Sequence, residues 1–218
     1  MNTSRIINSL DIKNNKIICE QNFIKNNEIS KDVLCLYNDN GKLINHFFDN
    51  RILLKIYDLY HLTRGQVSFF NNNIVFAMML YPKIYLFSIN GKLIKFKEYD
   101  FKWWQKIVFN KKKYEESKRK IGLRALVNML ASSTIVYSIN KYKNYLLIHI
   151  VNNVSSEPHH SVIILDKDLN LVEDIYRFKD YEYCNSSENY LYYAKEIKYF
   201  KKENSKEVEI LKCLYLEE

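Results

Sequence analysis

Apolar residues occur along this chain in short runs of about four to eight residues, separated by polar turns, a spacing typical of β-strands. Three segments align without gaps and show the pattern most clearly: Leu36–Ile44, Leu86–Ile94 and Ile164–Val172. Each predicts a strand, a short polar turn and a second strand. Gly41 and Gly91 occupy the position where a type I turn followed by a bulge needs a left-handed residue. Leu169 stands at that position in the third segment, so we expect the third turn to close differently.

The spacing of these hairpins predicts a repeat. Gly41 and Gly91 are 50 residues apart, whereas Gly91 and Leu169 are 78 apart. The excess nearly equals the segment 101–130, which resembles an insert more than a strand. Without that insert the period is near 50 residues with about four strands per unit, as in a β-propeller. The third strands of the four units would then hold equivalent residues, namely Leu36, Leu86, Ile164 and Leu214.

We therefore predict an all-β fold, a propeller-like array of about four antiparallel four-stranded blades with one helical insert. A single domain would span residues 1–218, with blades at about 5–48, 66–99, 133–177 and 180–216. The last blade would be incomplete, because the chain ends where its second hairpin turn is due. A β-sandwich or a meander without a central axis is the alternative fold. A half-open array, a shortened gene product and a tight four-bladed ring all remain open.

Composition agrees with a globular β protein. Of 218 residues, 47% are hydrophobic, 27% charged and 15% aromatic, and aromatic rings pack well on strands. With only 4 Gly and 2 Pro, the turns must rely on Asn and Asp, which tolerate left-handed backbone. The four cysteines lack metal-site spacing and lie in apolar runs, so we expect buried thiols, with a disulfide as the alternative: Cys19, Cys35, Cys184 and Cys213.

The aligned hairpins, above all Leu36–Ile44 and Leu86–Ile94, resemble the outer hairpins of TolB-like six-bladed β-propeller proteins. Uncharacterised members of that family are common in the Bacteroides group of bacteria. The resemblance covers the repeats but not the insert, so this chain would form a partial or reduced ring. It implies a turn and a fold, and it carries over no catalytic residue.

The N-terminus lacks a charged start followed by an apolar core, and no run of about 18 apolar residues could span a membrane. These features predict a cytoplasmic protein without a transmembrane segment. Export is the expectation if the sequence was cut from a longer chain.

The segment 101–130 carries most of the charge. It holds nine basic residues and two acidic ones, a net +7 of the total +8. Its second half predicts a helix from about Tyr114 to Leu130, with Gly122 inside it and an apolar face at helical spacing: Leu123, Leu126, Val127 and Leu130. We expect these four residues to be buried against the sheets.

A basic patch flanked by aromatic residues can hold acidic partners, phosphates or anionic lipid headgroups. The candidate binding residues in the insert are Trp103, Trp104, Lys111, Lys112, Lys113, Lys118, Arg119 and Lys120. The alternative is structural: the helix and the tryptophans pack on the propeller and the lysines are solvated. Nucleic acid is an unlikely partner, because no nucleic-acid-binding motif occurs.

His159 and His160 are a second candidate, on a long loop of the third blade. Adjacent histidines point in opposite directions on an extended chain, so a metal there would need ligands such as His46 or His61. We predict no metal and no cofactor. No Gly-rich phosphate loop, GxSxG elbow or HExxH motif occurs.

In a four-stranded meander the short turns lie on one face, while the long loops and the crossovers lie on the other. Binding residues concentrate on loops that a rigid scaffold positions. We therefore predict a non-enzymatic binding or scaffold module that meets a protein or an anionic polymer through the long-loop face and the basic insert. Self-association through the incomplete last blade is a further expectation. The alternative is a propeller-type hydrolase, of the lactonase or glycan-processing kind, with its site on the central axis.

Overall fold

The computed structural model describes residues 4–25, 28–29, 32–49, 64–105, 111–122, 125, 133–152, 159–178, 182–186, 190–197 and 207–214. Almost all of them form four antiparallel sheets. The first sheet contains β1 (Ser4–Lys13), β2 (Lys16–Lys25), β4 (Asp32–Asn38) and β5 (Leu43–Asp49), with the two-residue β3 (Glu28–Ile29) paired to β2. The second contains β6 (Gly65–Phe70), β7 (Asn73–Met78), β8 (Lys83–Ser88) and β9 (Leu93–Glu98).

The third sheet contains β10 (Thr134–Tyr142), β11 (Tyr145–Asn152), β12 (His159–Leu165) and β13 (Leu171–Phe178). The fourth contains β14 (Glu182–Ser186), β15 (Tyr190–Ile197) and β16 (Glu207–Leu214), three strands within the described residues. One helix of the described chain, α2 (Lys111–Ile121), lies between the second and third sheets in sequence. The predicted all-β, propeller-like array of blades is confirmed.

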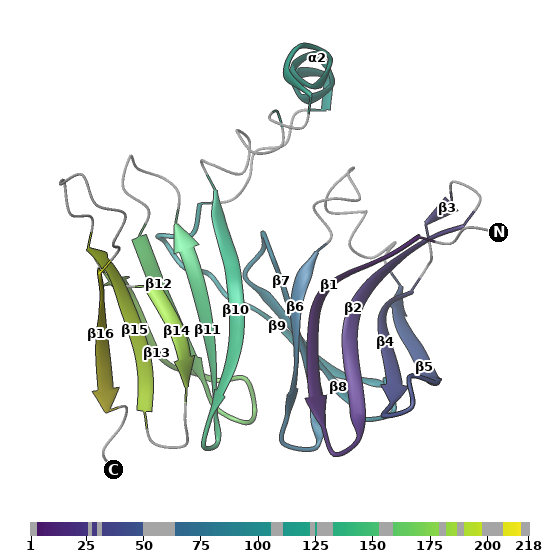
Figure 1. Cartoon of the computed structure of the whole chain (residues 1–218), viewed down its shortest axis with the longest axis horizontal. Coiled ribbons are helices and arrows are strands. Elements are labelled where there is room, and N and C mark those ends of the chain that lie inside the picture. Colours follow the sequence, from purple (N-terminus) through teal and green to yellow (C-terminus); the bar gives the residue numbers. More distant parts are fainter. Residues whose placement is uncertain are drawn as a thin grey trace.

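The sheets follow one another in chain order across the molecule. Figure 1 shows the first sheet at one end of the longest axis and the fourth at the other. In each sheet the strands pair in the order of the sequence, and the first strands of successive sheets lie against each other. Leu36, Leu86, Ile164 and Leu214 all lie on the third strand of their sheet, which confirms the predicted repeat.

Strand register places all the short turns on one face of the array. Lys16 pairs with Asn38 and Asn73 pairs with Ser88, so the turn after the first strand adjoins the turn after the third. The connections between second and third strands, and those between sheets, therefore emerge on the opposite face. We call these the short-turn face and the long-loop face. The helix α2, which connects two sheets, belongs to the long-loop face (Figure 1).

The three aligned turns close in the same way, which corrects our expectation for Leu169. The backbone N–H groups of Gly41, Gly91 and Leu169 each donate to the carbonyl three residues earlier, at 3.0, 2.8 and 3.0 Å. All three residues have positive φ, at 72°, 81° and 59°. Each turn is followed by a bulge at the same place in the ladder.

A left-handed leucine costs about 1–2 kcal/mol in backbone strain. Leu169 is fully buried in the core between the second and third sheets, where a leucine side chain contributes about 1.5–3 kcal/mol. Burial therefore outweighs the strain. Asp166 also stabilises the turn, because its carboxylate accepts hydrogen bonds from the backbone N–H groups of Asp168 and Asn170 at 2.8 and 2.7 Å.

Asparagine takes the place of glycine at the two-residue hairpins, as composition predicts. Asn14 and Asn15 connect β1 to β2 with φ of 48° and 58°, and Asn71 opens the β6–β7 turn with φ of 53°. Lys143 takes the same role before β11 with φ of 49°. These tight turns fix the register of each sheet.

Among the side chains that the structure describes, two hydrophobic cores join sheets, one between the first and second sheets and one between the second and third. The first core is rich in aromatic rings. Phe47 and Phe48 both contact Phe87, with ring centroids 5.2 Å apart in each pair. Consecutive strand residues normally point to opposite faces, but Phe48 has φ of 71°, and both rings enter the same core.

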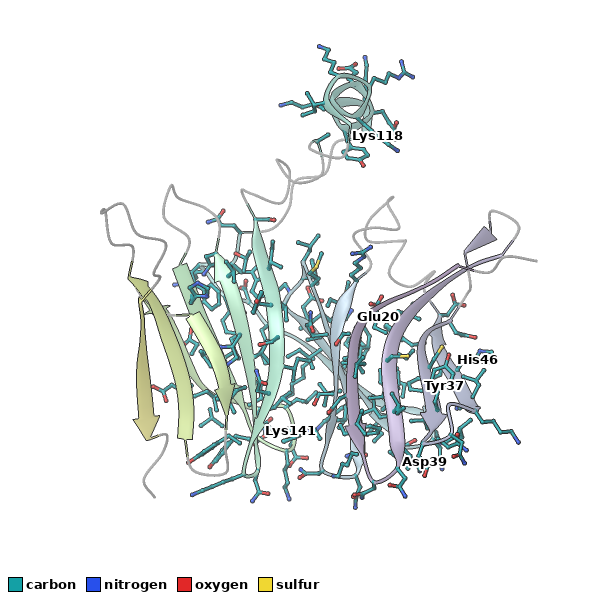
Figure 2. The ribbon with its side chains drawn as sticks, in the orientation of Figure 1. Glu20, Tyr37, Asp39, His46, Lys118 and Lys141 are labelled. Atoms are coloured by element: carbon teal, nitrogen blue, oxygen red, sulfur yellow. The ribbon has the colours of Figure 1, made fainter. Side chains whose placement is uncertain are left out.

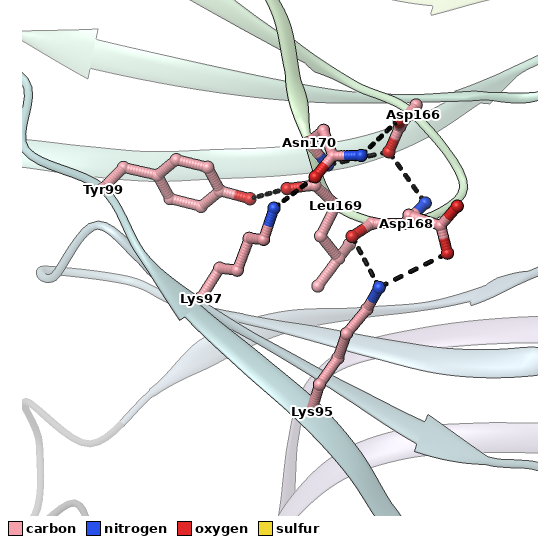
Figure 3. A network of polar contacts seen from close by, with 7 residues as sticks. All are labelled: Lys95, Lys97, Tyr99, Asp166, Asp168, Leu169 and Asn170. Carbon is pink, nitrogen blue, oxygen red and sulfur yellow. Dashed lines mark hydrogen bonds and ion pairs between the residues drawn. The ribbon is translucent and has the colours of Figure 1, made fainter.

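The outer strand of the second sheet also holds the turn of the third sheet (Figure 3). On β9 the ammonium of Lys95 donates to the carbonyl of Asp168 at 2.6 Å, and Lys97 donates to the side chain of Asn170. The hydroxyl of Tyr99 donates to the carbonyl of Leu169 at 2.7 Å, and burial raises the pKa of Tyr99, so this donor stays protonated.

The first and second sheets repeat this contact. On β5 the amide of Asn45 donates to the carbonyl of Asn90 at 2.8 Å, and the ring of Phe47 lies directly over Gly91. A Cβ atom at Gly91 would lie 2.4 Å from that ring, whereas a Cβ atom at Gly41 would meet nothing within 4 Å.

The two glycines form a matched pair for testing this contact. Gly91→Ala and Gly41→Ala both place alanine at positive φ, at a cost of about 1 kcal/mol each. Gly91→Ala must also displace the Phe47 ring, so we expect a further loss of about 1–3 kcal/mol in the free energy of unfolding. Urea unfolding of both variants measures the difference. Equal losses would show that Phe47 does not hold this turn.

Candidate functional site

The helix α2 stands apart from the sheets on the long-loop face (Figure 1). Its eleven residues, KKKYEESKRKI, contain six basic and two acidic side chains, a net charge of +4. Every basic side chain described on it is exposed, namely Lys112, Lys113, Lys118, Arg119 and Lys120. Figure 2 shows side chains extending from the helix in several directions, with Lys118 labelled on it. Tyr114 is the buried residue of α2.

The bounds of α2 correct the predicted helix. It begins at Lys111, before the predicted Tyr114, and it ends at Ile121. Ala125 is again helical, and the other residues from 123 to 130 lie outside the described part of the chain. Gly122, which we placed inside the helix, terminates it: Gly122 has φ of 61°, and its N–H donates to the carbonyl of Lys118 at 2.9 Å. The predicted apolar face lies outside the described residues: Leu123, Leu126, Val127 and Leu130.

The two tryptophans lie on the sheets rather than on α2. Trp104 is buried in the core between the second and third sheets, and Trp103 is half-buried against the same core. Phe101 stacks on Trp103 with ring centroids 4.9 Å apart, and the indole N–H of Trp103 donates to Asp174 at 3.1 Å. The tryptophans thus fix the segment that follows β9 against the third sheet. This packing agrees with the alternative in which they have a structural role.

We predicted that His159 and His160 lie on a long loop. They are instead the first two residues of the strand β12. His160 is half-buried and lies near His149, a buried residue of β11 that sequence reasoning did not single out. Burial, together with the charge of the nearby His160, lowers the pKa of His149 to about 3. His46 lies on β5 at the far end of the array, paired with Asp32 (Figure 2), and His61 lies outside the described residues.

A buried polar network lies beside this strand end. The hydroxyl of Thr134 donates to the amide oxygen of Asn152 at 2.6 Å, and the Asn152 amide donates to Ser161 at 3.1 Å. The backbone N–H of Gln105 donates to the Thr134 hydroxyl at 2.9 Å. These bonds join β10, β11 and β12 and attach the segment that leads toward α2. The network is a rigid support for the long-loop face.

A second polar cluster connects the first strands of three sheets. One carboxylate oxygen of Asp11 on β1 accepts hydrogen bonds from the Ser68 hydroxyl and the Phe69 N–H of β6, both at 2.8 Å. The same oxygen accepts one from the ammonium of Lys141 on β10 at 3.0 Å. Burial alone would raise the pKa of Asp11, but these hydrogen bonds outweigh it and lower the pKa. All the donors come from strands far away in sequence, so sequence reasoning missed this cluster.

The remaining candidate groups have structural partners. Cys19 and Cys35 are buried cross-strand neighbours, and the Cys19 thiol lies 3.7 Å from the Cys35 carbonyl. Within the described ranges, no three His, Cys, Asp or Glu side chains gather in a way that could hold a metal ion. The described helix is neither long nor apolar enough to cross a membrane.

Comparison with known proteins gives a fold but no function. No protein-family model and no curated protein matches this chain. A solved member of the DUF4221 family from Bacteroides vulgatus superimposes with a TM-score of 0.57 at 12% identity, over 85% of this chain and 57% of that one. The AfRom2 CNH domain gives a TM-score of 0.33 at 9% identity, over 98% of this chain and 65% of that chain.

The chain thus spans a little over half of the length of the DUF4221 structure, and the likeness at this identity shows the fold alone. A neighbour from Bacteroides is consistent with the Bacteroides-type part of the resemblance. Neither comparison names a TolB-like protein, so that part stays a prediction.

Asp11→Asn tests the cluster of the first strands. The pKa of Asp11 is lowered in the fold, so its carboxylate stabilises the protein above its unfolded pKa, and this contribution is lost as the pH falls through the folded value. We expect a loss of about 1–2 kcal/mol at pH 7, since the site is still partly exposed. The difference from wild type should shrink below about pH 4, the ordinary range for Asp. Urea unfolding between pH 3 and pH 7 measures it, and a difference independent of pH would contradict the ionic role.

His149→Leu tests the buried histidine. The fold favours neutral His149, so stability is complete above the unfolded pKa of 6.5 and falls as the pH decreases toward about 3. At pH 5 the histidine should cost about 2 kcal/mol relative to neutral pH. The leucine variant should lose less stability than wild type between pH 7 and pH 5. Identical pH profiles in thermal unfolding would show that His149 is not buried as described.

Proposed function

We propose that this chain is a non-enzymatic β-propeller-type binding module and that α2 is its contact with an anionic surface, on an acidic protein or a charged polymer. The stacked sheets act as a rigid scaffold that presents the helix on the long-loop face. The observation that supports this proposal most strongly is the exposure of the basic side chains of α2, which a helix used for packing would not need.

The charge of α2 is concentrated rather than balanced. Lysines occupy its first turn, which contains no acidic residue, and the positive end of the helix dipole lies there too. An isolated helix would be more stable with carboxylates at that end, by about 0.3–1 kcal/mol each. Basic residues also occupy the last turn, at Lys118, Arg119 and Lys120. The whole helix therefore presents positive potential, which attracts an anionic partner over about a Debye length.

The resemblance of the repeated hairpins also leads us to propose kinship with TolB-like propellers. The hydrolase alternative gains little support, because it needs carboxylates from several inner strands. Among the first strands of the four sheets, β6 and β10 carry none, and β14 carries one, Glu182, as its first residue. The carboxylate on β1, Asp11, is already bound by three donors.

Two matched triple variants test the role of α2. Lys112→Gln, Lys118→Gln and Lys120→Gln remove three exposed charges from the helix while keeping good helix formers. Lys42→Gln, Lys92→Gln and Lys167→Gln remove three exposed charges from turns of the short-turn face. The change in net charge is the same in both.

The probes are heparin and a fluorescent polyglutamate peptide, followed by fluorescence anisotropy at low salt. Three charge contacts of about 0.5 kcal/mol each predict an affinity about tenfold lower for the α2 variant and little change for the control. The free energies of unfolding from thermal melts of the two variants should agree within about 0.5 kcal/mol, as for most surface substitutions. Equal losses in both variants, or no binding by wild type, would contradict the proposal.

A further inference from the structure

Contacts between successive sheets have two different sides. One sheet supplies side chains, and the next sheet supplies backbone groups on what we call its receiving side. These backbone groups belong to its third-to-fourth-strand turn and, between the first and second sheets, also to its first strand. Between the first and second sheets, Ser9 accepts from the Val67 N–H at 3.0 Å and Asp11 from the Phe69 N–H. At the outer strand, Asn45 donates to Asn90. Lys95 and Tyr99 make the corresponding outer contacts with the third sheet.

The first sheet has a receiving side of its own. Counted back from the hairpin, Leu10 and Ile12 on β1 occupy the positions of Val67 and Phe69 on β6. Val67 and Phe69 are only 4% and 1% exposed, whereas Leu10 and Ile12 are 55% and 62% exposed. Their register neighbour Ile17 and the residue Tyr37 are half-buried and extend this apolar surface.

The outer part of the same side is equally open. Gly91 of the second sheet lies under Phe47, while nothing lies within 4 Å of the equivalent position at Gly41. Asp39 and Asn40 of that turn are exposed. The first strand and the turn of the first sheet are separate elements, and both are uncovered on the side where the second and third sheets are covered.

The fourth sheet is the other end of the array. It is the one described sheet with no described sheet after it, and Figure 1 places it at the opposite end of the longest axis from the first sheet. It therefore does not cover the first sheet of its own chain. In two copies related by a twofold axis, both open ends can meet at once, and such closed twofold dimers are the commonest oligomers.

We propose that the receiving side of the first sheet binds the fourth sheet of a second copy of this chain. The dimer repeats the sheet-on-sheet contact already present twice within the chain. Two chains of four sheets give eight, which lies within the range of about 4–8 blades of known propellers. This surface is distinct from α2, so the proposal is independent of the proposed function.

Light scattering coupled to size exclusion tests the dimer with the complete chain. The chain has a mass of 26.3 kDa, and we expect a particle of twice that mass. The concentration series should run from about 1 to about 100 μM, the range in which a micromolar Kd changes the occupancy. The double variant Leu10→Gln, Ile12→Gln loses two apolar contacts. The concentration at which half of the chain is dimeric should therefore rise at least about tenfold.

Leu93→Gln with Ile94→Gln is the matched control, since these residues are also exposed, at 44% and 51%, but lie on the outer strand of the second sheet. It should dimerise like wild type. A wild-type chain that stays monomeric throughout the series would overturn the proposal. A dimer that the Leu10 and Ile12 substitutions leave unchanged would overturn it as well, because association would then use another surface. Melting curves confirm that both variants are folded.

Discussion

Burial of the faces that neighbouring sheets turn toward each other is the constraint on which this structure depends. The second sheet shows it most fully, because the alternating residues of β7 and β8 enter the core with the first sheet on one face and the core with the third on the other. Strands buried on both faces cannot alternate apolar with polar residues, so they appear in the sequence as continuous apolar runs. Polar residues are left to the turns and to the outer strand. The turns must then be tight, and the hydrogen bonds of β5 and β9 to the following turns keep adjacent sheets aligned.

The repeat could be predicted from the sequence because its determinants are local. A strand, a polar turn and a second strand fit within nine residues, and Gly41 and Gly91 mark the left-handed position directly. Leu169 could not be interpreted in that way. Its backbone is strained, and the compensation comes from Trp104 and other side chains of a core assembled from two sheets. Gly122 was misplaced for a related reason, since a glycine can interrupt a helix or end it, and the deciding hydrogen bond to Lys118 is a matter of geometry.

The features of the candidate site also fall into those that the sequence predicts and those that it does not. Charge is visible in composition, so the basic character of the insert was available from the sequence alone. The place of Trp103 and Trp104 in a core was not, because their partners come from neighbouring sheets. Asp11 lies 57 residues from Ser68 and 130 from Lys141, and no local pattern connects such positions. His149 looked like one polar residue in an apolar strand, and only the pairing of β11 with β12 brings it near His160.

The position of α2 also has an entropic consequence. The helix and its flanking segments connect β9 to β10 at the end of the sheets away from the tight hairpins, and the second and third sheets are already joined by a hydrophobic core and by the contacts of Lys95, Lys97 and Tyr99. Lengthening a connection between two elements that are held together independently costs little, about 0.6 kcal/mol for each doubling of its length. The fold can therefore accept extensive change in this segment, in length as well as in charge, while the sheets that carry it keep their register.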